Sequence, residues 1–328
     1  MRFDYRKICQ DLIKGLSPKQ KEVVLFRFAL NGEGAAKDRE TLEAVGKRFG
    51  VTRERVRQIE ESGLRGIKSR SKKYSAVFQY FKNYFQSNGG LKKEDVAFAE
   101  LGEKKWGNQV YFLLSLDDKF RRFGENRDFW SSWSLSDSSL NLAKKTVDNL
   151  LQKLEESGKP LVLKELTRLS SLKASVLESY LAISKKIQKN REGFFGPKSW
   201  PEINPRGVKD KALLVFKKEQ KPLHFTEVSK SIAGSLVQTV HNELIRDPRF
   251  VLVGRGVYAL KEWGYEPGQV KDVIQKTLKE RGRPLTREEI LSQVLKQRMV
   301  KENTVFLNLG NKKNFSKDSQ GRYWIREA

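Results

Sequence analysis

Apolar residues recur at helical spacing in two adjoining stretches between residues 41 and 67. Gly50 and Val51 separate the stretches, and glycine readily adopts the left-handed conformation that ends a helix. Thr41 and Thr52 each stand just before a stretch, where a hydroxyl can accept a hydrogen bond from a free backbone N–H. The pattern therefore predicts helix, turn, helix, with a buried stripe formed by Leu42, Val45, Phe49, Val56, Ile59, Gly63 and Ile67.

Polar side chains occupy the opposite face of the second predicted helix. Arginine pairs with guanine, glutamine pairs with adenine, and glutamate accepts from cytosine. The side chains near the start of such a helix enter the major groove of DNA. We therefore expect base contacts from this segment, and a DNA backbone contact from Lys47 of the first helix. The expected readers are Arg53, Glu54, Arg57 and Gln58, with Arg55 beside them. The alternative is a solvated face whose charges pair with one another.

The residues upstream predict two further helices. Ser17 and Gln20 fit a capping box, and Pro18 suits the first helical position, so a helix is expected to run from there toward Leu30. The stretch NGEGAAKDRE that follows predicts a loop. An earlier helix is indicated by the apolar spacing of Ile8, Leu12, Ile13 and Leu16.

The rest of the chain repeats one pattern. GKPL, QKPL and GRPL carry prolines at 160, 222 and 284, which are 62 residues apart. An amphipathic stretch precedes each motif, and a second helical stretch follows it; in the last copy Thr286 and Glu289 form a capping box. Each copy ends in a hairpin pattern such as FVLVGRGVYAL, and a weaker copy runs from VFQYF to RDFWSSW. A fixed period of this size indicates an array of units that read helix, helix, helix, hairpin.

These patterns predict a mainly α protein. An N-terminal helix-turn-helix domain is followed by tandem winged-helix units with small β-hairpin wings. The expected domains are residues 1–73, 75–136, 142–204, 207–266 and 268–328. Aromatic residues near the hairpins are expected to anchor the wings in their cores rather than to stack on bases, and His224 and His241 to be caps or surface residues.

Charge narrows the class of partner. The chain has 328 residues with 65 Lys and Arg against 40 Asp and Glu, a net charge of +25, which suits a polyanion. Cys9 is the single cysteine, so neither a disulfide framework nor a thiolate metal cluster is expected. The N-terminus lacks the apolar core of a signal peptide, and we see no apolar run of membrane-spanning length. We expect a soluble cytoplasmic protein with no membrane contact.

The first domain resembles a known family. LSPKQKEVVLFRFAL and TLEAVGKRFGVTRERVRQIEESGLRGI are similar to region 4 of the primary bacterial sigma factors, over about residues 5–70. The resemblance implies binding of a promoter −35 element and packing on the β flap of RNA polymerase. It implies base contacts from the four readers named above, and backbone contacts from Arg27, Leu42, Glu43 and Thr52. Nothing in the chain resembles sigma region 2, so we do not expect a complete sigma factor.

The segment of about residues 207–266 resembles the HARE helix-turn-helix domain, which occurs in the delta subunit of RNA polymerase. KPLHFTEVSKSI and FVLVGRGVYALKEW carry this resemblance. The delta subunit has a long acidic tail, whereas residues 207–328 hold 24 Lys and Arg and 14 Asp and Glu, a net charge of +10. We therefore do not transfer a role in stripping nucleic acid from the polymerase.

Three classes of function are compared. The first is a sequence-specific, double-stranded DNA-binding transcription regulator that acts with RNA polymerase. The second is a non-catalytic, delta-like accessory subunit whose winged helices bind mainly protein. The third is an enzyme such as a nuclease, which needs a convergent site that the scattered acidic residues do not offer. We expect the first class, with no enzyme activity, no metal and no small-molecule cofactor.

Overall fold

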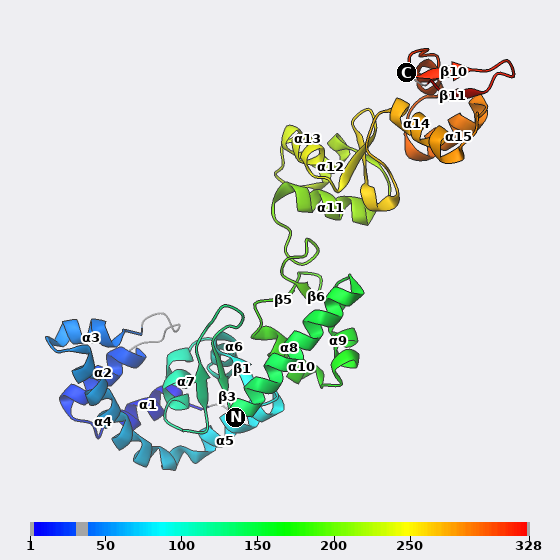
Figure 1. Ribbon diagram of the computed structural model, residues 1–328. Helices are drawn as coiled ribbons and strands as arrows, with labels where there is room; N and C mark the ends of the chain where they lie inside the picture. Colours follow the sequence, from blue (N-terminus) through cyan, green and yellow to red (C-terminus); the bar gives the residue numbers. More distant parts are fainter. Residues whose placement is uncertain (1–2, 31–38, 327–328) are drawn as a thin grey trace. The chain divides into compact units, whose positions relative to one another are not determined.

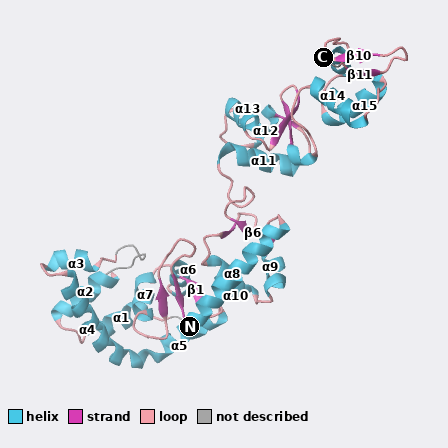
Figure 2. Cartoon of the chain, viewed as in Figure 1, coloured by secondary structure: helices cyan, strands magenta, loops and turns pink. Residues whose placement is uncertain are grey.

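Helices dominate the computed structural model, which describes residues 3–30 and 39–326 (Figure 1). It divides into two compact units, Met1–Ser199 and Trp200–Ala328. The strands form small antiparallel sheets (Figure 2), so the predicted mainly α class is confirmed. Most of the predicted loop at 31–40, residues 31–38, lies outside the described residues. Among the described residues, each helix is too short or too polar to cross a membrane.

The first unit starts with the predicted helices. The capping box at Ser17 and Gln20 is present at the start of the second helix. The first helix ends at Ile13, earlier than its apolar spacing indicated, so Leu16 lies in the turn before that box. The elements of this unit are α1 (Tyr5–Ile13), α2 (Pro18–Phe28), α3 (Leu42–Phe49), α4 (Arg53–Ser71), η2 (Lys72–Tyr74), α5 (Ser75–Ser87), β1 (Leu91–Lys93), α6 (Glu94–Leu101), α7 (Gly107–Leu114), β2 (Arg121–Phe123), β3 (Ser132–Ser134), α8 (Asp137–Ser157), β4 (Leu161–Val162), α9 (Leu163–Ser170), α10 (Ala174–Ala182), β5 (Ile187–Lys189) and β6 (Phe194–Pro197).

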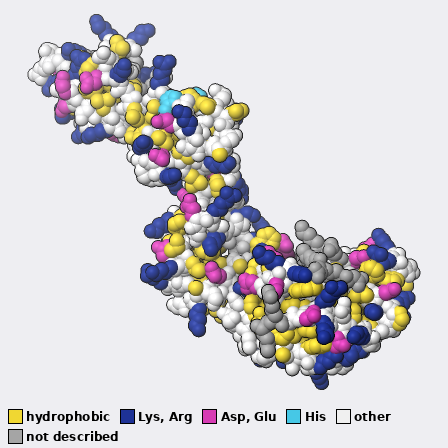
Figure 3. All heavy atoms as spheres, turned by 180° about the vertical axis from the view of Figure 1, so that it is seen from behind, with side chains coloured by type: hydrophobic (Ala, Val, Ile, Leu, Met, Phe, Trp, Pro, Cys, Tyr) yellow, Lys and Arg dark blue, Asp and Glu magenta, His cyan; other side chains and the backbone are white. Residues whose placement is uncertain are grey.

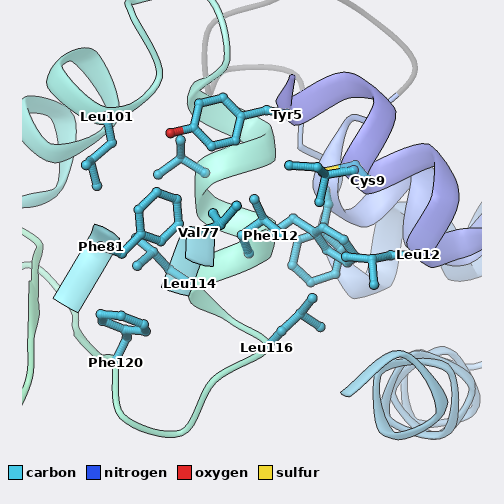
Figure 4. Close-up of a cluster of buried hydrophobic side chains, with 14 of the residues drawn as sticks. Tyr5, Cys9, Leu12, Val77, Phe81, Leu101, Phe112, Leu114, Leu116 and Phe120 are labelled. Atoms are coloured by element: carbon cyan, nitrogen blue, oxygen red, sulfur yellow. The ribbon is translucent and has the colours of Figure 1, made fainter. Parts of the chain in front are cut away.

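One hydrophobic core joins α1, α2 and the later part of α4 to the segment that follows them, while α3 and the start of α4 pack in a separate cluster with α2. Helix α7 lies against α1 and α2, and the Phe28 ring meets those of Tyr111 and Phe112 at centroid distances of 5.7 and 5.1 Å. Tyr5 and Leu12 of α1 share this core with Phe81 of α5 (Figure 4). Burial of the same apolar surface therefore holds α1, α2 and the end of α4 together with residues 75–136.

Two three-stranded sheets follow within this unit, in the orders β1-β3-β2 and β4-β6-β5. Helix α10 docks where Gly89 and Gly90 turn the chain into β1. The Tyr180 hydroxyl donates to the Gly89 carbonyl at 3.1 Å, and a Cβ at Gly89 would lie 2.6 Å from the Val176 side chain. Glycine is needed there both for this close approach and for its φ of +77°.

The second unit contains two further copies of the repeat. The predicted hairpin at Gly254-Arg255-Gly256 joins β8 to β9 in the sheet β7-β9-β8, and the capping box of Thr286 and Glu289 is present. Its elements are α11 (Gly207–Glu219), β7 (Leu223–His224), α12 (Phe225–Ser231), α13 (Val237–Arg246), β8 (Phe250–Gly254), β9 (Val257–Leu260), η3 (Lys261–Trp263), α14 (Val270–Arg281), α15 (Arg287–Gln297), α16 (Glu302–Leu309), β10 (Phe315–Lys317) and β11 (Tyr323–Ile325).

A buried arginine lies between these two copies. Arg298 is only 3% exposed, and burial lowers the pKa of its guanidinium. Its Nη2 atom donates to the carbonyls of Glu266 and Gly268 at 2.7 and 3.0 Å, and Nη1 donates to that of Gln297 at 2.7 Å. The backbone that links the copies is therefore held by side-chain hydrogen bonds as well as by the chain itself.

Candidate nucleic-acid interface

The turn between α3 and α4 sets the position of the candidate reading helix. The Thr41 hydroxyl accepts from the Ala44 N–H at 3.1 Å, and the Thr52 hydroxyl accepts from the Arg55 N–H at 3.2 Å. Gly50 ends α3 with a φ of +62°. A Cβ at position 46 would lie 2.7 Å from the Val51 carbonyl oxygen. Because Gly46 has no Cβ, the turn can pack closely on α3. The predicted caps and turn are confirmed.

Helix α4 has one buried and one exposed face, as its spacing predicts. Val56 and Ile67 are fully buried and Ile59 is 8% exposed, because this face packs on α2 and α3. The four predicted readers, Arg53, Glu54, Arg57 and Gln58, are all exposed in the first two turns of the helix. The structure therefore brings these four side chains together where a DNA groove could receive them.

Arg57 lies at the centre of an exposed network of charges. Its Nη2 atom is 2.8 Å from Glu54 Oε1, and its Nη1 atom is 3.2 Å from Glu61 Oε2. The hydrogen bond from Arg57 holds the pKa of Glu54 below its usual range, and the same bond raises the pKa of Arg57. Exposed pairs of this kind contribute little to stability, so they can be exchanged for contacts with a ligand.

Arg55 and Gln58 form a second polar pair on this helix. Arg55 Nη1 donates to Gln58 Oε1 at 3.1 Å, and a hydrogen bond from the Gln58 side chain helps to lower the pKa of Glu54, so Gln58 belongs to the same exposed polar network. On α3, exposed Lys47 lies 3.3 Å from Glu43.

Arg27 differs from the other predicted contacts because it is a structural tie. Its side chain is 23% exposed, and Nε donates to Glu60 Oε2 at 2.8 Å, which joins α2 to α4. Nη1 donates to the Glu40 carbonyl just before α3. Arg27 thus fixes the helices that carry the readers.

A hollow of about 410 Å³ runs beside α4. It is lined by Arg27 and Leu42, two of the residues predicted to contact the DNA backbone, and by Arg57, one of the predicted readers. Lys68 also lines it and pairs with Asp118 at 2.6 Å, a contact fifty residues away that no local pattern could reveal.

Arg48 is a further residue that the pattern did not single out. Its guanidinium lies 4.3 Å above the Phe26 ring and its Nη2 atom 2.6 Å from Glu40. Because these contacts hold α3 against α2, Arg48 supports the helix-turn-helix from behind the reading face. One sequence signal could have identified Arg48: it is a basic side chain in the last turn of a helix, where the helix dipole favours a cation.

Basic side chains are not confined to α4. On the face drawn in Figure 3, Lys and Arg are spread over both units with Asp and Glu among them. Among the described residues, no group of three His, Cys, Asp or Glu side chains is placed to hold a metal ion. Within the described chain, α4 is distinguished by the types and alignment of its side chains rather than by charge alone.

Comparison with known proteins agrees with this geometry. Residues 12–69 match the family described as sigma-70, region 4. RNA polymerase sigma factor SigA of Clostridium acetobutylicum is 46% identical over 74 residues, which cover 21% of this chain and 18% of that protein. The chain thus spans less than a fifth of the length of this curated relative, and the match covers the helix-turn-helix.

Proposed function

We propose that this chain is a sequence-specific DNA-binding transcription regulator that acts with bacterial RNA polymerase at promoters with a −35-like element. The observation that carries the proposal is the alignment of Arg53, Glu54, Arg57 and Gln58 on the exposed start of α4. Their side chains match the donors and acceptors of base edges in the major groove. Their place in a stretch that matches sigma-70 region 4 supports the same reading.

The remaining predicted site residues are assigned to the DNA backbone. Thr52 accepts a hydrogen bond at the helix start, so its hydroxyl proton can be given to a phosphate. Lys47 and Arg55 supply exposed cations, and Leu42 and Glu43 lie in the first turn of α3. Arg27 would contribute mainly by holding α2, α3 and α4 in place.

The polymerase contact and the C-terminal units complete the proposal. We assign the β flap of the core polymerase as the docking partner of the region 4-like domain. Because this partner acts in transcription, we also assign the chain to the cytoplasm. The 207–266 unit is assigned as a HARE-type winged helix within an array of four such units. The resulting role is regulation by binding, without catalysis.

Substitution of the two central readers tests this function. Arg57→Ala and Gln58→Ala should each weaken binding to a selected preferred duplex by about 1–3 kcal/mol, because each removes a base contact. Binding to random duplex should change much less, since phosphate contacts remain. Lys47→Ala is the matched control, and it should weaken both duplexes about equally. Fluorescence anisotropy at one fixed salt concentration measures the affinity of the unchanged chain and of each variant for both duplexes.

Equal loss on both duplexes for Arg57→Ala would overturn the proposed reading of bases. Helix α4 would then be an electrostatic patch, and the head would serve only to dock on protein. Affinity that stays constant as salt rises would also count against it, because release of counterions makes phosphate contacts strongly salt-dependent.

An accessory-subunit role is the second candidate, and one observation favours it. Leu236 and Ile245 at the ends of α13 are 75% and 61% exposed, and Leu307 of α16 is 78% exposed. Apolar side chains on these helices suit contact with protein better than contact with phosphate. In this role the winged helices would bind the polymerase, and DNA specificity would be weak in its absence.

A further inference from the structure

We propose that a hollow in the first unit binds single-stranded nucleic acid through stacking on Trp130. The hollow has a volume of about 490 Å³ and lies where α6 and β1 meet α10, β5 and β6. Its walls include two aromatic rings, Trp130 and Phe195, and two lysines, Lys92 and Lys189. It shares no lining residue with the hollow beside α4.

Lysine ammonium groups lie on the aromatic rings of this hollow. Lys93 Nζ and Lys185 Nζ are 4.9 and 4.4 Å from the centre of the Trp130 ring, and Lys189 Nζ is 5.4 Å from that of Phe195. Proteins that bind single strands combine aromatic platforms for bases with cations that follow the phosphates. The hollow concentrates both parts within one small region.

Trp130 differs from its neighbour Trp133 in a way that points to a ligand. Trp133 is 3% exposed, and its indole N–H donates to Glu94 at 2.9 Å, which accounts for it as part of the core. Trp130 is 36% exposed, while its backbone N–H bonds to the Ile183 carbonyl. The backbone of Trp130 is thus fixed by the fold, and its ring is presented at the surface.

The side chains of Lys93 and Lys185 are 23% and 20% exposed, and polar contacts, in addition to the ring, hold their ammonium groups; Lys185 Nζ also donates to the Asn126 carbonyl at 2.8 Å. Lys93 pairs with Asp95 at 2.8 Å, and Lys185 pairs with Glu125; both carboxylates are well exposed. Ion pairs with exposed carboxylates contribute little to stability, so phosphates can replace these carboxylates as partners of the ammonium groups. A base that stacks on Trp130 would displace the ammonium groups from the ring, and the phosphates of the same strand would receive them.

Lys92, which lines the hollow, is held in place by two polar contacts. Lys92 is 9% exposed, and its Nζ donates to Asn88 Oδ1 at 2.9 Å and lies 3.3 Å from Glu100 Oε2. Glu178 on the opposite wall is exposed and can accept from the amino group of a base. The bases of a duplex stack on one another and offer no free face to the Trp130 ring, which selects a single strand.

Titration of the full chain with labelled single strands tests the proposal. Oligothymidylate, oligouridylate and a duplex of equal length are compared by fluorescence anisotropy at one salt concentration. Trp130→Ala should weaken single-strand binding about 5- to 150-fold, the loss expected for one stacked base, and leave duplex binding nearly unchanged. Trp130→Phe keeps a ring and should restore most of the affinity. The two oligonucleotides distinguish DNA from RNA as the source of the strand.

A second pair of variants separates a fold defect from the loss of a site. Lys185→Gln should weaken single-strand binding, whereas Lys159→Gln, at an exposed lysine outside the hollow, should have a smaller effect. Equal affinity for Trp130→Ala and the unchanged chain, or equal effects of the two lysine variants, would overturn the proposal. The outcome is independent of base reading by α4, because the Arg57→Ala comparison uses duplexes alone.

Discussion

Helices α4 and α13 hold the same position in two parts of the chain, and their surfaces differ in chemistry. Each is the second helix of a helix-turn-helix pair, packed on α3 and on α12 respectively. The exposed start of α4 carries Arg53, Glu54 and Arg57, whereas Leu236 and Val237 are exposed at the start of α13. The same pair of helices therefore presents polar side chains suited to bases on α4 and apolar side chains suited to protein on α13. The exposed side chains, rather than the helix arrangement, differ between the two.

The two helices also depend on different cores. Helix α4 belongs to a domain whose apolar side chains are shared with α5 and α7, while α13 packs in a core confined to residues 208–263. The region 4-like domain is thus integrated into a larger body. The apolar core that carries α13 lies within its own repeat, which polar contacts such as Met299 N–H to the Val253 carbonyl at 2.7 Å connect to the next repeat. This difference can be tested independently of function.

The largest effect is expected from truncating the shared core. Phe28→Ala should lower the free energy of unfolding of the first unit by about 3–5 kcal/mol, because Phe28 is 4% exposed and packs on Tyr111 and Phe112. Calorimetry should show the loss in the transition of the first unit alone. Phe216→Ala in the core of the α13 unit is the control, and it should lower only the transition of the second unit. If Phe28→Ala leaves residues 75–136 as stable as before, the two parts do not share a core.

A smaller effect, the loss of about 1–3 kcal/mol expected for Arg57→Ala, separates the surfaces of the two helices. Ile245→Ala on α13 should change duplex DNA affinity by less than about 0.5 kcal/mol, the usual range for an exposed position outside a binding site. Arg57→Ala on α4 provides the contrast. Anisotropy with the preferred duplex measures both. A loss for Ile245→Ala as large as that for Arg57→Ala would mean that α13 also binds DNA, and the distinction between the helices would disappear.

The smallest effect concerns acid stability. Burial would raise the pKa of Asp247, but hydrogen bonds from Arg249 outweigh it and hold this pKa below its usual value. A carboxylate with a lowered pKa in the folded state stabilises the fold above its unfolded pKa, and this contribution is lost as pH falls through the folded pKa. We expect a loss below about 1 kcal/mol for the second unit below about pH 4, after allowance for solvent screening.

Thermal melts across this pH range measure the loss. Asp247→Asn should remove this part of the pH dependence, while Glu54→Gln on α4 should not, because both Glu54 and Arg57 are exposed. An unchanged acid profile for Asp247→Asn would show that the Arg249 contact contributes nothing to stability.

Sequence patterns located the local features well. Thr41, Gly50 and Thr52 could be assigned because capping and positive φ depend on one or two neighbouring residues. The hairpin wings could be predicted for the same reason, because a glycine-containing turn lies between two short apolar runs. The exposed readers on α4 followed from helical periodicity alone.

Contacts between distant segments were beyond such patterns. The packing of α7 on α1 and α2, the Lys68–Asp118 pair and the role of Arg27 as a tie depend on tertiary arrangement. The short strands β4 and β7 were missed because each has two residues, and each is defined by pairing with a hairpin more than thirty residues later. The cluster around Trp130 likewise joins residues 93, 130 and 185, which no spacing rule connects.

The buried Arg298 constrains how the last two repeats can diverge. One guanidinium satisfies three carbonyls, two of which belong to the linker residues Glu266 and Gly268. Insertion or deletion of a residue in this linker would move those carbonyls and leave a buried donor unpaired, at a cost of about 1–3 kcal/mol or more. Substitutions that keep the backbone path retain the carbonyls. The linker is therefore restricted in length, and also in sequence at Gly268, where φ is +124° and a Cβ would lie 3.0 Å from Asp272; an array of this kind would drift by substitution elsewhere while its period is preserved.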